Sequence, residues 1–136
     1  MPTIENTRRL KEAKGEYDVV VDGGAIGTLT LRASADDTLG NDIPRGAVIE
    51  GGYIEVEAAL TSGGLATVAA NADGVGDLLA AAAIGGVPWS APGRQSLLPV
   101  FTGASTVKTT ARRSLAISIA TAALTAGRFR VVVFYR

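Results

Sequence analysis

The stretch VVVDGGAIGTLTLR (residues 19–32) joins a β-branched run to a cluster of glycines and then to a second apolar segment. Such a stretch can open a nucleotide-binding unit, in which a glycine-rich turn holds a phosphate at a helix N-terminus. Its glycines follow the pattern G-G-x-x-G, however, and not the G-x-G-x-x-G of a dinucleotide fingerprint. Residues 28–32 also alternate polar and apolar side chains, which is typical of a half-buried strand. The stretch therefore predicts a hairpin with its tight turn at residues 22–24, in an all-β protein.

The same period of two recurs along the rest of the chain. Residues 53–58 (YIEVEA) place Ile54, Val56 and Ala58 on one predicted face, and residues 114–120 (SLAISIA) alternate most cleanly of all. Further short strands are predicted, separated by Gly, Pro, Asn and Asp, at residues 17–21, 65–70, 97–101, 105–110 and 129–135. About eight strands with short turns favour a jelly-roll-like β-sandwich of two sheets.

Two segments depart from the β pattern. Residues 73–84 (DGVGDLLAAAAI) are rich in Ala and Leu, and we expect Asp77 to cap a short helix that ends at the following glycines. Residues 1–15 are charged and have few apolar anchors, so they predict an N-terminal arm that either frays or orders on a partner. The predicted organisation is an arm over residues 1–15 and one β-sandwich domain over residues 16–136.

The composition excludes several kinds of chemistry. The 136 residues include no cysteine and no histidine, so thiolate metal sites and Ser-His-Asp catalysis are absent. Aromatic residues make up only 5% of the chain, which predicts a core of Ala, Val, Ile and Leu. The polar N-terminus is no secretory signal, and no apolar run is long enough to span a bilayer. We therefore expect a soluble protein that is not an enzyme, binds no cofactor and is not in a membrane.

The charges are divided unevenly along the chain, although the net charge is zero. Residues 1–77 hold all thirteen acids and six bases, a balance of −7, whereas residues 78–136 hold seven bases and no acid, a balance of +7. Strands from the two halves could pair these charges across a sheet, or oppositely charged faces of neighbouring copies could meet in an assembly. A third interpretation is nucleic-acid binding by the basic half. The bases are not interleaved with aromatic side chains, which argues against it.

Two local clusters are candidate binding features. Asp36, Asp37 and Asp42 lie close together beside Asn41, and their oxygens suit a hard cation such as Ca²⁺. Turns prefer the same residues, so the sequence leaves open whether they bind a cation. The only tryptophan, Trp89, lies in the loop GVPWSAPGR with Arg94. It is either a plug over one end of the sandwich or, with Arg94, an anchor at a protein interface.

Four segments together resemble the small structural proteins encoded beside the major capsid gene of tailed bacteriophages. They are YDVVVDGGAIGTLTLR, IPRGAVIEGGYIEVEAALTSGGLATV, GVPWSAPGR and VKTTARRSLAISIATAALTAGRFRVVVFYR, and they cover most of residues 17–136. The resemblance implies a capsid decoration (cement) protein with a jelly-roll-like fold. Such proteins commonly sit as trimers at three-fold positions of the shell and clamp neighbouring capsid subunits. The family has no active-site motif.

What the resemblance implies for this chain is a homotrimer that binds the major capsid protein. It would be made in the cytoplasm of the host bacterium and located on the capsid surface of the virion, with no small-molecule substrate. The expected contact residues are Arg8, Arg9 and Leu10 in the arm and Trp89 and Arg94 in the loop. The alternative is a carbohydrate- or protein-binding β-sandwich module of a phage tail or fibre. A carbohydrate site needs exposed aromatic side chains, of which this sequence has few.

Overall fold

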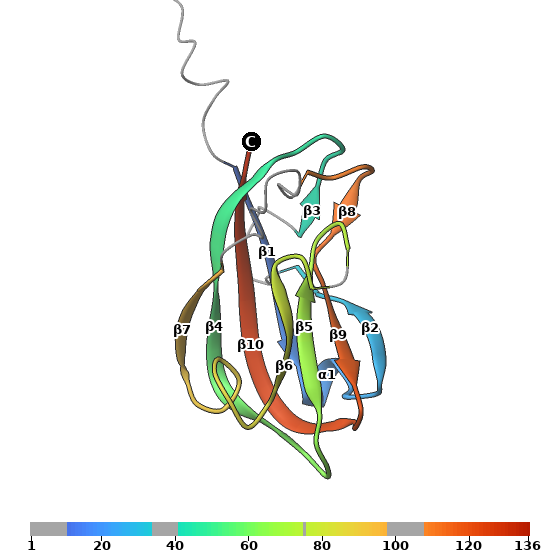
Figure 1. Cartoon of the computed structure of the whole chain (residues 1–136), viewed down its shortest axis with the longest axis vertical. Helices are drawn as coiled ribbons and strands as arrows, with labels where there is room; N and C mark the ends of the chain where they lie inside the picture. Colours follow the sequence, from blue (N-terminus) through green and yellow to red (C-terminus); the bar gives the residue numbers. More distant parts are fainter. Residues whose placement is uncertain (1–10, 34–40, 75, 98–107) are drawn as a thin grey trace, which may run out of the picture.

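The computed structural model describes residues 11–33, 41–74, 76–97 and 108–136 and contains two four-stranded antiparallel sheets packed face to face (Figure 1). The first sheet has the order β1-β10-β4-β7, with bounds Lys11–Asp18, Leu124–Tyr135, Ile49–Ser62 and Gly93–Leu97. The second has the order β2-β9-β5-β6, with bounds Gly27–Thr30, Ala116–Ala120, Thr67–Asn71 and Leu79–Ala83. A small pair, β3 (Asp42–Ile43) and β8 (Arg113–Ser114), and one helical turn, α1 (Val19–Asp22), complete the described elements.

The strand order is that of a jelly roll. Counted in chain order, the eight strands of the two sheets pair first with last, second with seventh, third with sixth and fourth with fifth (β1·β10, β2·β9, β4·β7 and β5·β6). This nesting is what results when one long antiparallel ribbon wraps into two facing sheets. It confirms the predicted all-β, jelly-roll-like sandwich of two sheets. The two sheets contain eight strands, as predicted, but not all of them are the predicted ones, because β6 replaces a predicted helix and residues 108–110 of the predicted strand 105–110 belong to neither sheet. The predicted strand at residues 97–101 is described only at Leu97, the last residue of β7.

The core lies between the two sheets and comes from alternate residues of each strand. Ile54 and Val56 of β4, predicted to point inward, are buried, as are Ile117 and Ile119 of β9. Ala58 is exposed, contrary to the prediction, because the register between β4 and β10 shifts opposite Arg128 and Phe129 and interrupts the alternation. Within the described part of the chain, no helix is long and apolar enough to cross a membrane.

The stretch of residues 19–32 is not the predicted hairpin. Strand β1 ends at Asp18, the next four residues form α1, and β2 belongs to the second sheet. Asp18 caps α1 by accepting a hydrogen bond from the backbone N–H of Val20 at 3.0 Å. The glycines, with φ of +80° at Gly23, therefore carry the chain from one sheet to the other.

The predicted helix at residues 77–84 is wrong as well. Leu79–Ala83 is strand β6, at the edge of the second sheet, where Ala83 pairs with Thr67 of β5. Alanine has a high helix propensity, but the pairing with β5 decides the conformation here. Asp77 does cap backbone groups. It accepts hydrogen bonds from the N–H groups of Ala72, Asp73 and Gly74 in the loop before it, at 2.7–2.8 Å.

The predicted boundary between arm and domain lies too late in the sequence. Lys11–Asp18 is one continuous strand, and residues 11–15 pair with residues 131–135 of β10. Ala13 is completely buried, and a side chain on Gly15 would overlap Leu31, which follows β2. Residues 11–15 therefore belong to the sandwich and not to an arm, and residues 1–10 lie outside the described residues.

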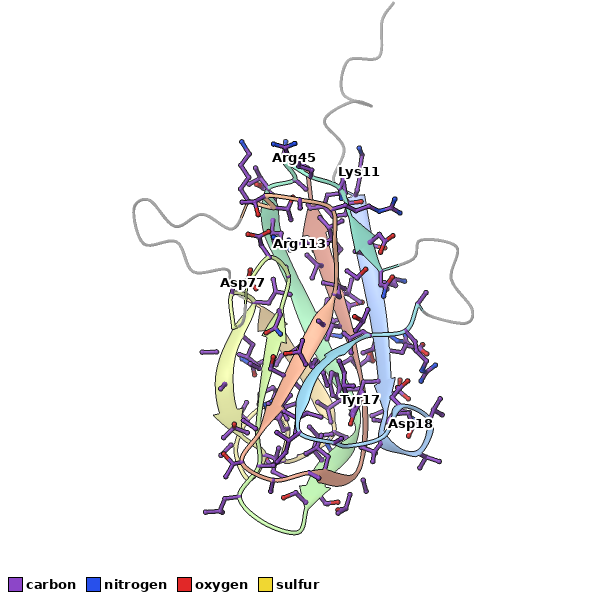
Figure 2. All side chains as sticks on the ribbon, turned by 90° about the vertical axis from the view of Figure 1, so that its right-hand side faces the viewer. Lys11, Tyr17, Asp18, Arg45, Asp77 and Arg113 are labelled. Atoms are coloured by element: carbon purple, nitrogen blue, oxygen red, sulfur yellow. The ribbon has the colours of Figure 1, made fainter. Side chains whose placement is uncertain are left out.

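The connections after β1, β4, β6 and β9 lie at the same end of the sandwich (Figure 1). We call it the neutral end; it consists of residues 19–26, 63–66, 84–92 and 121–123, whose only charged residue is Asp22. The opposite end holds the C-terminus and the β3–β8 pair, and we call it the charged end. Figure 2 shows Lys11, Arg45 and Arg113 toward the charged end and Tyr17 and Asp18 toward the neutral one.

Candidate interaction surfaces

Trp89 lies inside the sandwich and not on its surface. Its side chain is completely buried, and its ring centroid is 4.9 Å from that of Phe129 on β10. Tyr17 of β1 packs on the same phenyl ring at 5.2 Å. The carbonyl of Trp89 accepts a hydrogen bond from the N–H of Leu60 at 3.0 Å, which ties the loop to β4. Trp89 is therefore a plug beneath the neutral end, and its assignment as a partner contact is wrong because partners cannot reach it.

Tyr17 connects this aromatic cluster to the residues of the opening stretch. Its hydroxyl donates a hydrogen bond to the carbonyl of Gly23 at 2.6 Å. Burial, and then the carboxylates of Asp22 and Asp18, raise the pKa of Tyr17 to about 12. The hydroxyl therefore stays protonated at neutral pH and fixes the glycine turn to the core.

Arg94 is exposed, as a contact residue must be. It lies on β7 at a free edge of the first sheet, with its side chain 61% exposed. Its guanidinium makes an ion pair with Glu55 at 3.3 Å and lies over the ring of Tyr53, 4.4 Å from the centroid. These contacts hold the group against the outer face of the sheet. The other three expected contact residues, Arg8, Arg9 and Leu10, lie outside the described residues.

The uneven charge distribution is largely satisfied within the molecule. Seven ion pairs among the described residues, with distances of 2.6–3.5 Å, join an acid from residues 1–77 to an arginine from residues 78–136. They are Arg94–Glu55, Arg112–Asp42, Arg113–Asp73, Arg128–Glu57, Arg130–Glu16, Arg130–Glu57 and Arg136–Glu50. Of the three interpretations of the charge, pairing across a sheet is therefore confirmed.

The jelly-roll topology explains this pairing. In both large sheets and in the β3–β8 pair, every strand from residues 1–77 lies beside a strand from residues 78–136. An acidic first half and a basic second half therefore meet as alternating neighbours. On the outer face of the first sheet the register places Glu16, Arg130, Glu55 and Arg94 in one row of alternating charge across four strands.

The described residues of the acidic cluster, Asn41 and Asp42, make structural hydrogen bonds within the chain. The Asp42 carboxylate accepts hydrogen bonds from Ser114 and Arg112, both at 2.6 Å, and these bonds lower its pKa. Asn41 donates its amide to the carbonyl of Leu31. Asp36 and Asp37 lie outside the described residues, and the described ones include no group of three side chains able to hold a metal ion.

A second carboxylate, which sequence reasoning did not single out, organises the charged end. Asp73 accepts hydrogen bonds from the backbone N–H of Thr110 at 2.9 Å and from Nε of Arg113 at 2.8 Å. The bond from the Thr110 N–H and then the one from Arg113 lower the pKa of Asp73. No sequence signal predicts this contact, because it joins residues about forty positions apart.

Sequence reasoning also missed the apolar side chains of the neutral end. Five large hydrophobic side chains of the described chain are exposed, and all five are in the loops of this end. They are Val20 (90% exposed), Val21 (64%), Ile26 (58%), Leu65 (85%) and Val87 (70%). A count of charges in the connecting segments would have marked this end, since only Asp22 is charged.

No protein-family model and no curated protein matches the sequence. Three solved structures are similar in fold, and each aligns over 93% of this chain. A chain of the acidic stable capsid structure of Helicobacter pylori bacteriophage KHP30 has a TM-score of 0.60 at 13% sequence identity, with 86% of that chain covered. A chain of the cyanophage Pam1 capsid asymmetric unit has a TM-score of 0.58 at 17% identity, with 84% of that chain covered. A chain of the capsid of Ralstonia phage GP4 has a TM-score of 0.57 at 18% identity, with 83% of that chain covered. The protein therefore shares its jelly-roll fold with chains from three phage capsid structures.

Proposed function

We propose that this protein is a structural component of a tailed-bacteriophage virion, which decorates the head shell and stabilises it by clamping neighbouring major capsid subunits. The observation that carries the proposal is the agreement in fold, over 93% of the chain, with chains of three phage capsids. The resemblance of the sequence to capsid decoration proteins points to the same role. The proposed location is the capsid surface of the virion.

The internal contacts and charge pairing of the sandwich suit a structural role. The ion pairs between the two halves, the nested strand order and the buried cluster of Trp89, Phe129 and Tyr17 all stiffen the sandwich. The sequence has no histidine or cysteine for nucleophilic or general-base chemistry. A protein that binds the edges of assembled subunits needs such a fixed shape and no reaction of its own.

The proposed assembly is a homotrimer on the major capsid protein. Arg8, Arg9 and Leu10 remain proposed contacts from the sequence, and Arg94 remains one because it is exposed at a free sheet edge. Trp89 is withdrawn as a contact because it is buried. The alternative, a carbohydrate- or protein-binding module of a tail or fibre, needs exposed aromatic side chains in its carbohydrate-binding form, and Trp89 is not one of them.

Co-sedimentation with shells of the major capsid protein of the phage that encodes this chain tests the function. The purified protein is mixed with expanded shells and with unexpanded ones, and the pelleted fraction is measured. We expect saturable binding to the expanded shells and a solution mass of three times the 13.8 kDa of the chain. A protein that stays in the supernatant at micromolar concentration contradicts the decoration role, and a monomeric mass contradicts the trimer.

A further inference from the structure

The neutral end presents a group of exposed apolar side chains from three loops. Val20 and Val21 are in α1, Ile26 follows the glycine turn, Leu65 lies between β4 and β5, and Val87 lies between β6 and β7. Single exposed hydrophobic residues are normal on protein surfaces, but all five here belong to loops at the same end of the sandwich, and an exposed apolar surface of this kind marks an interaction site. No large hydrophobic side chain is exposed elsewhere in the described chain.

Backbone hydrogen bonds join the loops of the neutral end in two pairs. The N–H of Leu124 donates to the carbonyl of Gly24 at 2.8 Å, which joins the β9–β10 turn to the loop after α1. The N–H of Ile84 donates to the carbonyl of Ala66 at 3.2 Å, which joins the loop before β7 to the loop after β4. Little conformational entropy is therefore lost when a partner binds, and a preformed surface of this kind favours affinity.

The polar contacts beneath α1 keep its valines on the outside. Asp22 accepts a hydrogen bond from the N–H of Asp18 at 2.9 Å and makes an ion pair with Arg32 at 2.7 Å. The polar side of the turn therefore faces the protein. Val20 is consequently 90% exposed on the opposite side.

The charges at this end limit what can bind there. Asp22, the one charged residue of the four loops, is already paired with Arg32. A nucleic acid or an anionic lipid surface requires basic side chains, and the neutral end has none to offer. A charged protein surface that docked here would lose its hydration without gaining an ion pair in return. The complementary partner is an uncharged, apolar protein surface.

We propose that the neutral end is the face that docks on the capsid shell, against an uncharged apolar patch of the major capsid protein. This inference rests on the proposed function and specifies which surface carries it. Side chains as exposed as Val20 and Leu65 project from the surface, so they bury most area in the hollows of a different protein. Two copies of this end would instead set projecting side chains against each other.

Charged substitutions at the two most exposed positions test the proposal in the full-length protein. Val20→Asp and Leu65→Asp change side chains that are 90% and 85% exposed, so the fold tolerates both. Lys108→Asp is the control, because Lys108 is exposed near Arg45, away from the neutral end. Each variant is compared with the wild type in co-sedimentation with expanded shells, and its solution mass is measured.

We expect both neutral-end variants to bind the shells at least about tenfold more weakly, while Lys108→Asp binds like the wild type. If the wild type binds and both neutral-end variants bind equally well, the neutral end is not the docking face and the proposed function still stands. If these variants lose the solution mass of the wild type, the neutral end joins copies of this chain, which also overturns the inference. If the wild type itself fails to bind, the proposed function fails and the inference fails with it.

Discussion

The indole of Trp89 packs against the ring of Phe129 with centroids 4.9 Å apart, so a loop residue closes the core beneath the neutral end. Phe129 also contacts Tyr17 on the neighbouring strand β1, and the Tyr17 hydroxyl fixes the glycine turn that follows α1. Two of the neutral-end loops are therefore tied to one aromatic cluster. Substitutions in this cluster should change stability first and binding only as a consequence.

Trp89→Ala should lower the free energy of unfolding by about 3–5 kcal/mol, because it leaves a large cavity in the core. Denaturation with urea, followed by circular dichroism, measures the loss. Val87→Ala in the same loop is the matched control, since Val87 is 70% exposed and should cost less than about 0.5 kcal/mol. Equal stability of Trp89→Ala and the wild type would contradict the buried position of the indole.

Tyr17→Phe should cost about 1 kcal/mol at neutral pH by removing the hydrogen bond to Gly23. The folded pKa of Tyr17, about 12, lies above the ordinary 10.0. The stability that depends on the protonated hydroxyl is thus complete below pH 10 and is lost as the pH rises toward 12. Urea denaturation across this range should show a steeper decline for the wild type than for Tyr17→Phe. Parallel declines would show that Tyr17 ionises normally.

The alternating strands could be predicted from the sequence because their inward residues are large. Ile54, Val56, Ile117 and Ile119 give a clear period of two, and all are buried. Strand β1 gives no such signal, because its inward positions before Tyr17 are Ala13 and Gly15. Gly15 is required by the close approach of Leu31, which follows β2, and only the tertiary structure reveals this contact.

Two other predictions failed because tertiary contacts overrode local preference. The alanines of β6 favour a helix locally, and their pairing with β5 makes them a strand. The glycine turn after Asp22 has hairpin chemistry, yet the strands on either side join different sheets. For the candidate site, a Pro/Gly-rich loop indicates exposure, and it could not show that Trp89 turns inward onto Phe129.

Asp73→Asn should lower the free energy of unfolding at pH 7 by about 1–2 kcal/mol, because hydrogen bonds from Thr110 and Arg113 to a charged carboxylate are lost. Those bonds lower the pKa of Asp73 in the folded protein. Its contribution is therefore present above the ordinary carboxyl pKa and is lost as the pH falls through the lower, folded pKa. Urea denaturation should show that the difference in free energy of unfolding between the wild type and Asp73→Asn is largest at pH 7 and shrinks as the pH falls into the acid range. A difference independent of pH would refute the assignment.

Arg130→Gln should cost about 1 kcal/mol, since Arg130 is only 31% exposed and bridges Glu16 and Glu57. Arg94→Gln is the control from the same row of charges. Its side chain is 61% exposed and should contribute less than about 0.5 kcal/mol. Denaturation at low salt and in 1 M salt, where the Debye length is about 3 Å, should show the Arg130 effect persisting better. If both variants lose equal stability, the lower exposure of Arg130 does not strengthen its ion pairs.

Deleting residues 1–10 should leave the sandwich folded, whereas deleting residues 1–15 should not. The shorter deletion keeps every described pairing between β1 and β10, while the longer one removes five of the eight residues of β1. It also removes the completely buried Ala13 and exposes the edge of β10, which promotes aggregation. Thermal unfolding should show the midpoint of the shorter variant within about 3 °C of the wild type and no cooperative transition for the longer one.

Because the shorter variant is folded, its binding to expanded shells tests Arg8, Arg9 and Leu10 as contacts. Unchanged binding of the shorter variant would remove these three residues from the proposed interface. If they are contacts, a full-length variant with alanine at all three positions should bind the shells as weakly as the deletion does.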